Sequence, residues 1–239
     1  MYGLGTIINM AAIVAGGLLG AVFGRFLNES TQDTLTKVCG VSTLFIALTG
    51  VLEKMLRVEG SQIVSSGTML VLACLAIGGL IGEWLKIEDG FEKFGQWLKV
   101  KSGNARDKEF VNAFVTASLT VCIGAMAIVG AIQDGISGDY SILAMKAALD
   151  LIIIAVMSCS LGKGAVFSAI PVGILQGSVT VLAGLLRSVM TDAALNNLSL
   201  VGNVLIFCVG INLVCGKKIK VANLLPAVVV AVIAAFLPI

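Results

Sequence analysis

SILAMKAALDLIIIAVMSCSL, residues 141–161, is the stretch that decides the fold class of this chain. Its only charged residues are Lys146 and Asp150. Because a hydrocarbon core of about 30 Å is crossed by roughly 20 apolar helical residues, the stretch predicts one membrane-spanning helix. The run Leu151–Val156 is apolar on every side, which excludes the alternating pattern of a membrane β-barrel.

The remainder of the chain has the same character. Its 239 residues are 58% hydrophobic and 13% charged, and the mean hydropathy is +1.03. These values lie outside the range of soluble domains. We expect an all-α, polytopic transmembrane bundle forming a single integral membrane domain over residues 1–239. About eight spans are predicted, at Gly3–Gly24, Val38–Leu52, Ile63–Gly82, Phe110–Ile132, Ser141–Leu161, Gly164–Leu186, Asn197–Cys215 and Val221–Ile239. The second is the shortest uncharged stretch, so seven spans stay open.

Basic residues are distributed unevenly between the two sides of such a bundle. Loops of one side have only Lys54, Arg57 and Arg187. Short basic loops stay in the cytoplasm, so both termini are expected to be extracytoplasmic. The other side holds Arg25, Lys37, Lys86, Lys93, Lys99, Lys101, Arg106, Lys108, Lys163, Lys217, Lys218 and Lys220.

The longest connection, residues 86–109, has the pattern of an amphipathic helix. Apolar side chains at helical spacing alternate with charged ones, as in Phe91, Phe94, Trp97 and Leu98 against Glu92, Lys93 and Lys99. A helix lying on the cytoplasmic membrane surface is the favoured interpretation, and docking of a partner is the alternative.

Several classes of function are excluded by composition. The chain has no histidine, and its six cysteines form no Cys-x-x-Cys pair, which argues against zinc sites, haem and His-based triads. A net charge of +2 is too small to indicate nucleic-acid binding. An intramembrane enzyme is the weakest hypothesis, since a Ser/Lys dyad would need Ser158, three turns from Lys146. We therefore expect no enzyme activity and no cofactor.

Glycines mark where helices approach closely. Gly16, Gly20 and Gly24 repeat at every fourth position of the first span, and Gly78 and Gly82 do so in the third. Small residues at this spacing let helix backbones come into contact. Because both spans run in the same direction, we expect the glycines to bring parallel helices together.

A faint internal similarity accompanies these glycines. Gly17 and Gly40 bracket a polar loop near the N-terminus, and Gly177 and Gly202 bracket another near the C-terminus. The copies are separated by an odd number of helices, which predicts an inverted repeat of spans 1–3 and 6–8, as in many transporters.

The charged pair of the fifth span is the main candidate site. Lys146 and Asp150 lie one helical turn apart, and Asp150 is about halfway along the span. Ionisable groups at that depth usually face a cavity or a partner. A substrate or ion site and a purely structural pair are both open interpretations. Gln176, Asn203 and Asn9 are further polar residues within spans, and each alone is typical of an interhelical hydrogen bond.

Two prolines interrupt predicted spans. Pro171 and Pro226 each deprive a carbonyl of its helical donor. Unwound backbone near these prolines would make Asn223 part of a polar lining, whereas a simple kink is the alternative. Asp134 lies in the expected outer turn between spans four and five, where it either attracts cations or solvates the turn.

Several motifs together resemble the YqgA/YdfK-like bacterial inner-membrane proteins, a domain of unknown function. The resemblance covers essentially the whole chain and is carried by residues 124–130, the Asp-Gly and Gly-Asp turn, Ser141-Ile142-Leu143, Lys146, Leu149-Asp150, Gln176-Gly177 and Asn223-Leu224-Leu225-Pro226. It implies the bacterial inner membrane as location and places Asn9, Glu83, Lys146 and Asp150 within the family's pattern. It implies no activity.

These observations predict an integral membrane protein that transports or conducts a small solute or ion. Asp150 and Lys146 are the expected central site, with Gln176, Asn203, Asn223 and Asn9 as polar lining. A non-transporting scaffold or sensor is the alternative. The expected partners are the lipid bilayer and the solute or ion, with nucleic acid excluded and homo-oligomer formation left open.

Overall fold

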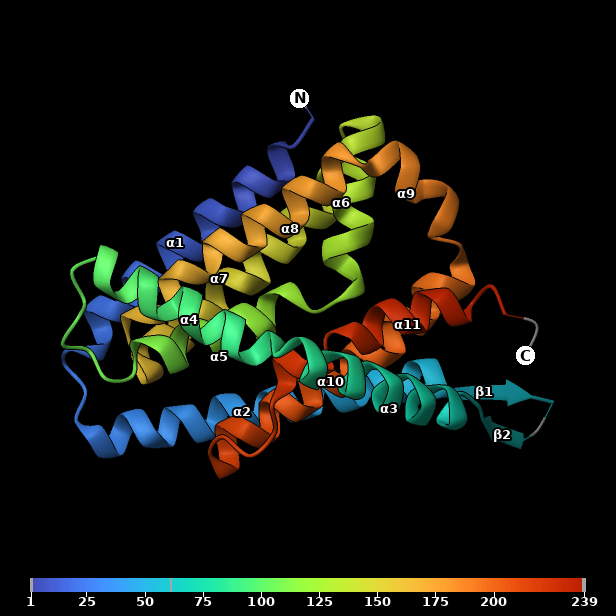
Figure 1. The fold of residues 1–239 in the computed structure, drawn as a ribbon. Coiled ribbons are helices and arrows are strands. Elements are labelled where there is room, and N and C mark those ends of the chain that lie inside the picture. Colours follow the sequence, from blue (N-terminus) through green and yellow to red (C-terminus); the bar gives the residue numbers. More distant parts are fainter. Residues whose placement is uncertain (1, 61, 238–239) are drawn as a thin grey trace.

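The computed structural model describes residues 2–60 and 62–237, and nearly all of the regular structure in this part is helical (Figure 1). The elements in chain order are α1 (Leu4–Gly24), α2 (Glu29–Met55), β1 (Leu56–Glu59), β2 (Gln62–Ser65), α3 (Thr68–Leu85), α4 (Ile87–Lys101), α5 (Phe110–Cys122), α6 (Ala125–Ser137), α7 (Ser141–Leu161), η1 (Lys163–Ser168), α8 (Ala169–Val181), α9 (Ala183–Val189), α10 (Asp192–Cys215), η2 (Val221–Leu224) and α11 (Pro226–Ala234). This confirms the all-α polytopic class.

Six helical segments of the described chain are long and apolar enough to cross a membrane. They are α1, α2, α3, α7, α10 and the continuous segment Lys163–Val181, formed by η1 and α8. A seventh span results if α5 and α6, which are bent by 62° relative to each other, count as one. The expected eighth span is a shorter apolar helix, Val221–Ala234; the rest of that predicted stretch includes residues 238–239, outside the described residues.

One predicted span starts later than expected. The sequence predicts that the third span begins at Ile63, but Gln62–Ser65 instead pairs with Leu56–Glu59 as an antiparallel hairpin. The helix begins only at Thr68, after Gly67 with a φ of 87°. β-branched Ile63 and Val64 suit a strand, and the preceding Gly60 supplies a positive φ for the turn.

The helices form two groups that diverge toward one side (Figure 1). The first layer consists of α1, α7 and α8 with α6 packed against them, and the second consists of α2, α10, α11 and α3. Helix α5 contacts both groups. The layers meet where α2 packs against α7.

The predicted glycine faces do bring helices into backbone contact. A Cβ on Gly16 or Gly24 would collide with the backbone of Leu151 or Cys159 in α7. The partner numbers rise together, so α1 and α7 are parallel, although the prediction had the glycines of the first and third spans bringing those two spans together. Helix α3 differs, because Gly78 meets Ala227 and Gly82 meets Asn223. These partner numbers fall as the glycine numbers rise, so α3 packs antiparallel against η2 and α11, and the parallel expectation was wrong for this helix.

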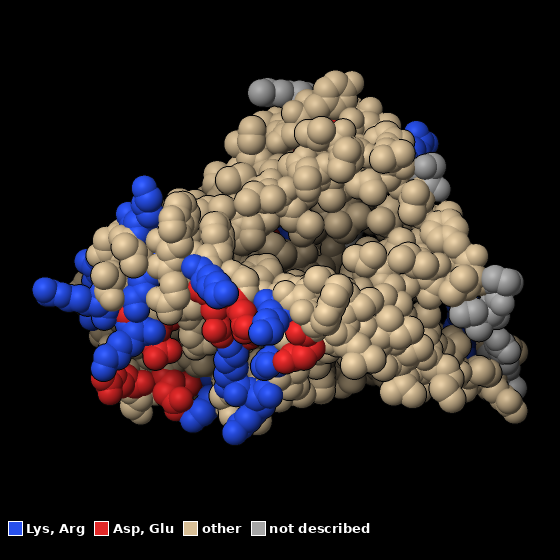
Figure 2. All heavy atoms as spheres, in the orientation of Figure 1, with Lys and Arg blue, Asp and Glu red and all other residues tan. Residues whose placement is uncertain are grey.

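The outer surface of the bundle is apolar. Large side chains such as those of Phe45, Leu80 and Ile152 are well exposed on the spans, as expected for lipid-facing helices. Charged side chains instead gather over one end and the adjoining lower part of the face shown in Figure 2. The first residues of α1, the end of α11 and the hairpin lie away from that end (Figure 1).

The connection predicted to be amphipathic contains the helix α4. Lys86, with a φ of 52°, turns the chain sharply between α3 and α4. Leu98 is buried, and Gly95 of α4 packs against Phe114 of α5. Trp97 stays about half exposed and stacks on Phe94. One face of α4 therefore covers α5, while its position at a membrane surface stays a prediction.

Candidate functional site

The charged pair predicted in the fifth span is a buried ion pair in α7. The Nζ of Lys146 lies 2.8 Å from Oδ1 and 2.6 Å from Oδ2 of Asp150. Only 8% of Lys146 and 3% of Asp150 is exposed. Residues four apart lie one above the other on a helix, and this face of α7 points into the first layer. The two charges are therefore neutralised locally at the depth of the spans.

Two neighbouring side chains complete the surroundings of this pair. Asn9 of α1 is fully buried and lies against the Asp150 carboxyl group, although its side-chain atoms make no hydrogen bond of ordinary geometry. Cys122, the last residue of α5, is close enough to both charges to interact with them electrostatically. The pair thus lies where α1, α5 and α7 meet.

Cys122 also marks a break in a span. The sequence predicts one continuous helix over Phe110–Ile132, but α5 ends at Cys122 and α6 starts at Ala125 with a 62° change of direction. The intervening Ile123 and Gly124 are not helical. The signal for this break in the sequence is Gly124 within an apolar run, and not a proline. The break leaves backbone polar groups without helical partners beside the buried pair.

The two prolines do not unwind a span at its middle, because each lies near the start of a helix. Pro171 is the third residue of α8, directly after the 3₁₀ segment η1. Pro226 is the first residue of α11, directly after the 3₁₀ segment η2. At the start of a helix proline lacks only a donor that would be unpaired anyway. Asn223 accordingly lies in 3₁₀ backbone, close to the prediction.

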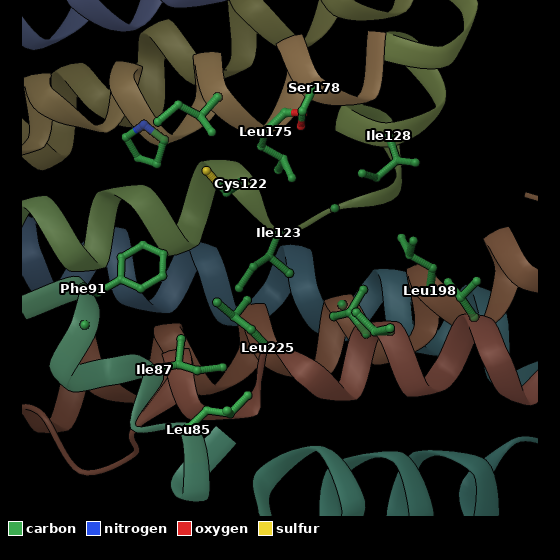
Figure 3. Close-up of a pocket in the computed structure, with 18 of the residues that line it drawn as sticks. Leu85, Ile87, Phe91, Cys122, Ile123, Ile128, Leu175, Ser178, Leu198 and Leu225 are labelled. Carbon is green, nitrogen blue, oxygen red and sulfur yellow. The ribbon is translucent and has the colours of Figure 1, made fainter. Parts of the chain in front are cut away.

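A cavity of about 920 Å³ separates the two layers next to the break (Figure 3). Its lining is almost entirely apolar, with Lys86 as the only charged lining residue and Ser178 as a polar one. The labelled apolar wall residues are Leu85, Ile87, Phe91, Ile123, Ile128, Leu175, Leu198 and Leu225. Cys122 also lines this cavity, so one side chain adjoins both the cavity and the Lys146–Asp150 pair.

The remaining predicted lining residues divide between the layers. Gln176 of α8 is buried in the first layer, and neither its amide nitrogen nor its oxygen has a hydrogen-bond partner among the described residues. It does not line the cavity. Asn203 of α10 packs against Gly50 of α2 in the second layer, and its Nδ2 lies 3.5 Å from Oγ of Ser199. The structure therefore does not bring Asn203 to the charged pair.

Asn223 belongs to a second polar cluster, at the corner between α3 and α4. Its Oδ1 accepts a hydrogen bond from the backbone nitrogen of Glu88 at 2.7 Å, and its Nδ2 donates to Glu83 at 2.6 Å. Lys220 pairs with Glu83 at 2.8 Å. This hydrogen bond raises the pKa of Lys220. Glu83, which the resemblance implied, thus serves this corner and not the Lys146–Asp150 pair.

Glu88 also belongs to this corner, although no motif in the sequence marks it as a site residue. Only 4% of Glu88 is exposed, yet its carboxylate accepts a hydrogen bond from the backbone nitrogen of Ala222 at 3.0 Å and pairs with Lys217 at 2.9 Å. Partial burial lowers the pKa of Lys217, but its hydrogen bonds to Glu92 and Glu88 outweigh this and raise it overall. A carboxylate at the start of a helical segment satisfies its free N–H groups, so the cluster ties α4 to η2.

The comparisons agree with the membrane character of the chain. A family model described as "Protein of unknown function (DUF554)" matches residues 4–236. The "Uncharacterized membrane protein YdfK" of Bacillus subtilis (strain 168) is 28% identical over 232 residues, covering 97% of this chain and 95% of the relative. The "Uncharacterized protein YqgA" of Escherichia coli (strain K12) is 30% identical over 233 residues, covering 95% and 94%. No solved structure matches the chain at a significant level.

Proposed function

Because the chain belongs to the DUF554 family and is a helical membrane protein, we propose that it transports a small solute past the buried Lys146–Asp150 pair. The observation that carries this proposal is the position of the pair, buried within α7 and near Cys122, which also lines a large cavity.

The energetic argument starts from the charges. Removing a carboxylate and an ammonium group from water is costly, and their mutual attraction repays this only with good geometry. A pair of well-packed apolar side chains would stabilise α7 as well or better. Ionisable groups inside membrane spans usually mark substrate or ion pathways. The pair therefore supports a functional role over a purely structural one.

The bent span supports the same function. Non-helical backbone at membrane depth is tolerated where it is covered by protein or lines a cavity, and discontinuous helices form the binding sites of many transporters. Here Ile123 and Gly124 of the break line the cavity. A change of the bend between α5 and α6 would alter access to the cavity and to the charged pair together.

The lining of the cavity suggests the class of solute. Its walls are apolar, while the neighbouring pair offers one positive and one negative group. We therefore propose a solute with an apolar body and a charged or zwitterionic end, in place of a bare ion. We propose that the protein moves the solute without making or breaking covalent bonds, and a scaffold or sensor is the competing hypothesis. The cavity beside the pair favours transport, since a scaffold needs neither feature.

Membrane orientation is part of the proposal. The gathering of charged residues at one end of the bundle (Figure 2) supports the bacterial inner membrane with that end in the cytoplasm. Both termini would then be extracytoplasmic. An inverted repeat stays a prediction.

Uptake into proteoliposomes tests the proposal. The purified chain is reconstituted, and the uptake of radiolabelled apolar amino acids, short-chain carboxylates and primary amines is compared with that of protein-free vesicles. We expect accumulation of at least one solute class, at least tenfold slower with Asp150→Asn, while the exposed-turn variant Asp139→Asn retains the wild-type rate. Equal uptake with and without protein across all three classes would support the scaffold instead.

A further inference from the structure

Buried polar atoms without hydrogen-bond partners are concentrated in the first layer and in the adjoining helix α5. Among the described residues they belong to Thr6 and Asn9 of α1, Ser118 of α5, Asp134 of α6, and Gln176 and Thr180 of α8. No helix of the second layer contributes one within the described residues. An unpaired buried polar group destabilises a protein because it loses its hydrogen bonds to water, so such a concentration requires an explanation.

Asp134 is the one carboxylate among these groups. It is fully buried, and its Oδ2 accepts a hydrogen bond from the backbone nitrogen of Gly5 at 2.9 Å. Its Oδ1 has no hydrogen-bond partner. No Lys or Arg of the described residues forms an ion pair with it. A carboxylate buried with one oxygen unpaired is costly unless a proton or a cation neutralises it.

The register between α1 and α8 shows which neutral groups lie near Asp134. Gly17 faces Val166 and Gly173 faces Met10, so the two helical segments run antiparallel. Continuing the same register places Gln176 level with the residue after Thr6.

Thr180 is linked to Asp134 directly through α6. A Cβ on Gly135 would meet the backbone oxygen of Thr180, so the C-terminal part of α8 adjoins the residue that follows Asp134. The hydrogen bond from Gly5 brings Thr6, the next residue of α1, to the same place. Backbone contacts therefore place Thr6 and Thr180 beside the neighbours of Asp134, and Gln176 lies one helical turn before Thr180 on α8.

We propose that Asp134, Thr6 and Gln176 form a binding site for one alkali cation of the size of Na⁺. Carboxylate, hydroxyl and amide oxygens are the ligands that hard cations prefer. One cation neutralises the carboxylate and satisfies several oxygens simultaneously, whereas a proton on Asp134 satisfies that group and at most one other. Binding of the cation does not depend on the proposed transport function.

Asn9 extends this row of polar groups toward the charged pair. It follows Thr6 by about one helical turn on α1 and lies against Asp150. If the transport proposal holds, a cation at Asp134 would be positioned to act as the coupling ion, which is the part of the inference that rests on the proposed function.

Thermal unfolding of the purified full chain in detergent tests the site. NaCl is titrated against N-methylglucamine chloride at constant ionic strength and constant pH, and binding of ²²Na⁺ is measured in parallel. We expect Na⁺ to raise the Tm saturably, on the order of 5 °C, and Asp134→Asn to abolish both the rise and the binding. Asp139→Asn, which removes an exposed carboxylate nearby in the chain, should respond like the wild type.

A second variant covers the case in which Asp134→Asn does not fold. Thr6→Val keeps the shape of the side chain but removes one ligand oxygen, and we expect it to raise the half-saturating Na⁺ concentration at least fivefold. An identical Na⁺ response of wild type and Thr6→Val would overturn the proposal. So would a wild-type Tm that is insensitive to Na⁺.

Discussion

Gly20 of α1 lies against the backbone carbonyl of Ala155 in α7 so closely that no side chain fits at position 20. This contact holds the backbones of the two parallel helices directly against each other. The same two helices carry Asn9 and Asp150, whose side chains meet between them. Glycine packing and the geometry of the candidate site are therefore coupled.

Replacement of Gly20 by Leu should separate α1 from α7. Overpacking in a close contact typically costs about 1–3 kcal/mol, so we expect the Tm in detergent to fall by several degrees. The matched control is Gly177→Ala on α8, where an added Cβ would meet nothing within 4 Å. If Gly20→Leu melts with the wild type, α1 and α7 do not pack through these glycines.

A second glycine pair distinguishes a backbone contact from ordinary packing. A Cβ at Gly82 would collide with the backbone of Asn223, whereas one at Gly79 would only touch the flexible Leu224 side chain at 3.3 Å. Gly82→Ala should therefore lower the Tm clearly, by about 2–4 °C for each kcal/mol lost. Gly79→Ala should be nearly neutral, and equal effects of the two would exclude the antiparallel contact of α3 with η2.

Much of the helical framework could be predicted from local sequence. Long apolar stretches identify spans because each satisfies its own backbone hydrogen bonds. The Lys146–Asp150 pair was equally accessible, since a spacing of four on one helix brings the two side chains together without any tertiary information.

Other parts of the site depend on contacts that a single sequence does not encode locally. The backbone nitrogen of Gly5 donates a hydrogen bond to the carboxylate of Asp134, 129 positions away in the sequence. The backbone nitrogen of Ala222 donates one to Glu88, 134 positions away. After the break at Gly124, α6 likewise packs against α8, a contact between segments that are distant in the sequence. Asn203 was predicted to line the same site as Asp150 because the sequence indicates that both residues lie within spans. The sequence does not indicate that α10 belongs to the second layer.

The orientation of the bundle can be measured with reporter fusions. Because the connection 86–109 is basic, we expect a fluorescent-protein fusion within it to be active and an alkaline-phosphatase fusion there to be inactive. A phosphatase fusion placed after residue 237 should be active. Phosphatase activity from the 86–109 fusion, with none from the C-terminal fusion, would reverse the proposed orientation.

The corner between α4 and η2 has a defined pH dependence. Interactions with Glu92 and Glu88 raise the pKa of Lys217 above its ordinary 10.5. A cation with a raised pKa stabilises the fold fully below its unfolded pKa, and this stabilisation is lost as the pH rises through the folded value. Lys217→Met should therefore lower the Tm at pH 7, and the gap to wild type should narrow only above about pH 10.5. A gap that is constant from pH 7 to 11.5 would show that the charge of Lys217 contributes nothing.

The buried pair of α7 allows structure and function to be separated. Asp150→Asn leaves the Lys146 ammonium without its partner, and removal of one member of a buried pair typically costs about 3–5 kcal/mol. The double variant Asp150→Asn with Lys146→Met removes both charges. We therefore expect the Tm to fall strongly in the single variant and to recover largely in the double variant, as measured by thermal unfolding in detergent.

Activity should not follow stability in this comparison. If the pair contacts the solute, the double variant regains its Tm while uptake into proteoliposomes stays at least tenfold below wild type, because the groups that bind the solute are gone. If the pair is purely structural, uptake returns with the Tm. Single variants that are as stable and as active as the wild type would remove Lys146 and Asp150 from the site. An unpaired charge in an apolar interior lowers stability, so an unchanged Tm would show that the remaining charge is not buried in the functional protein.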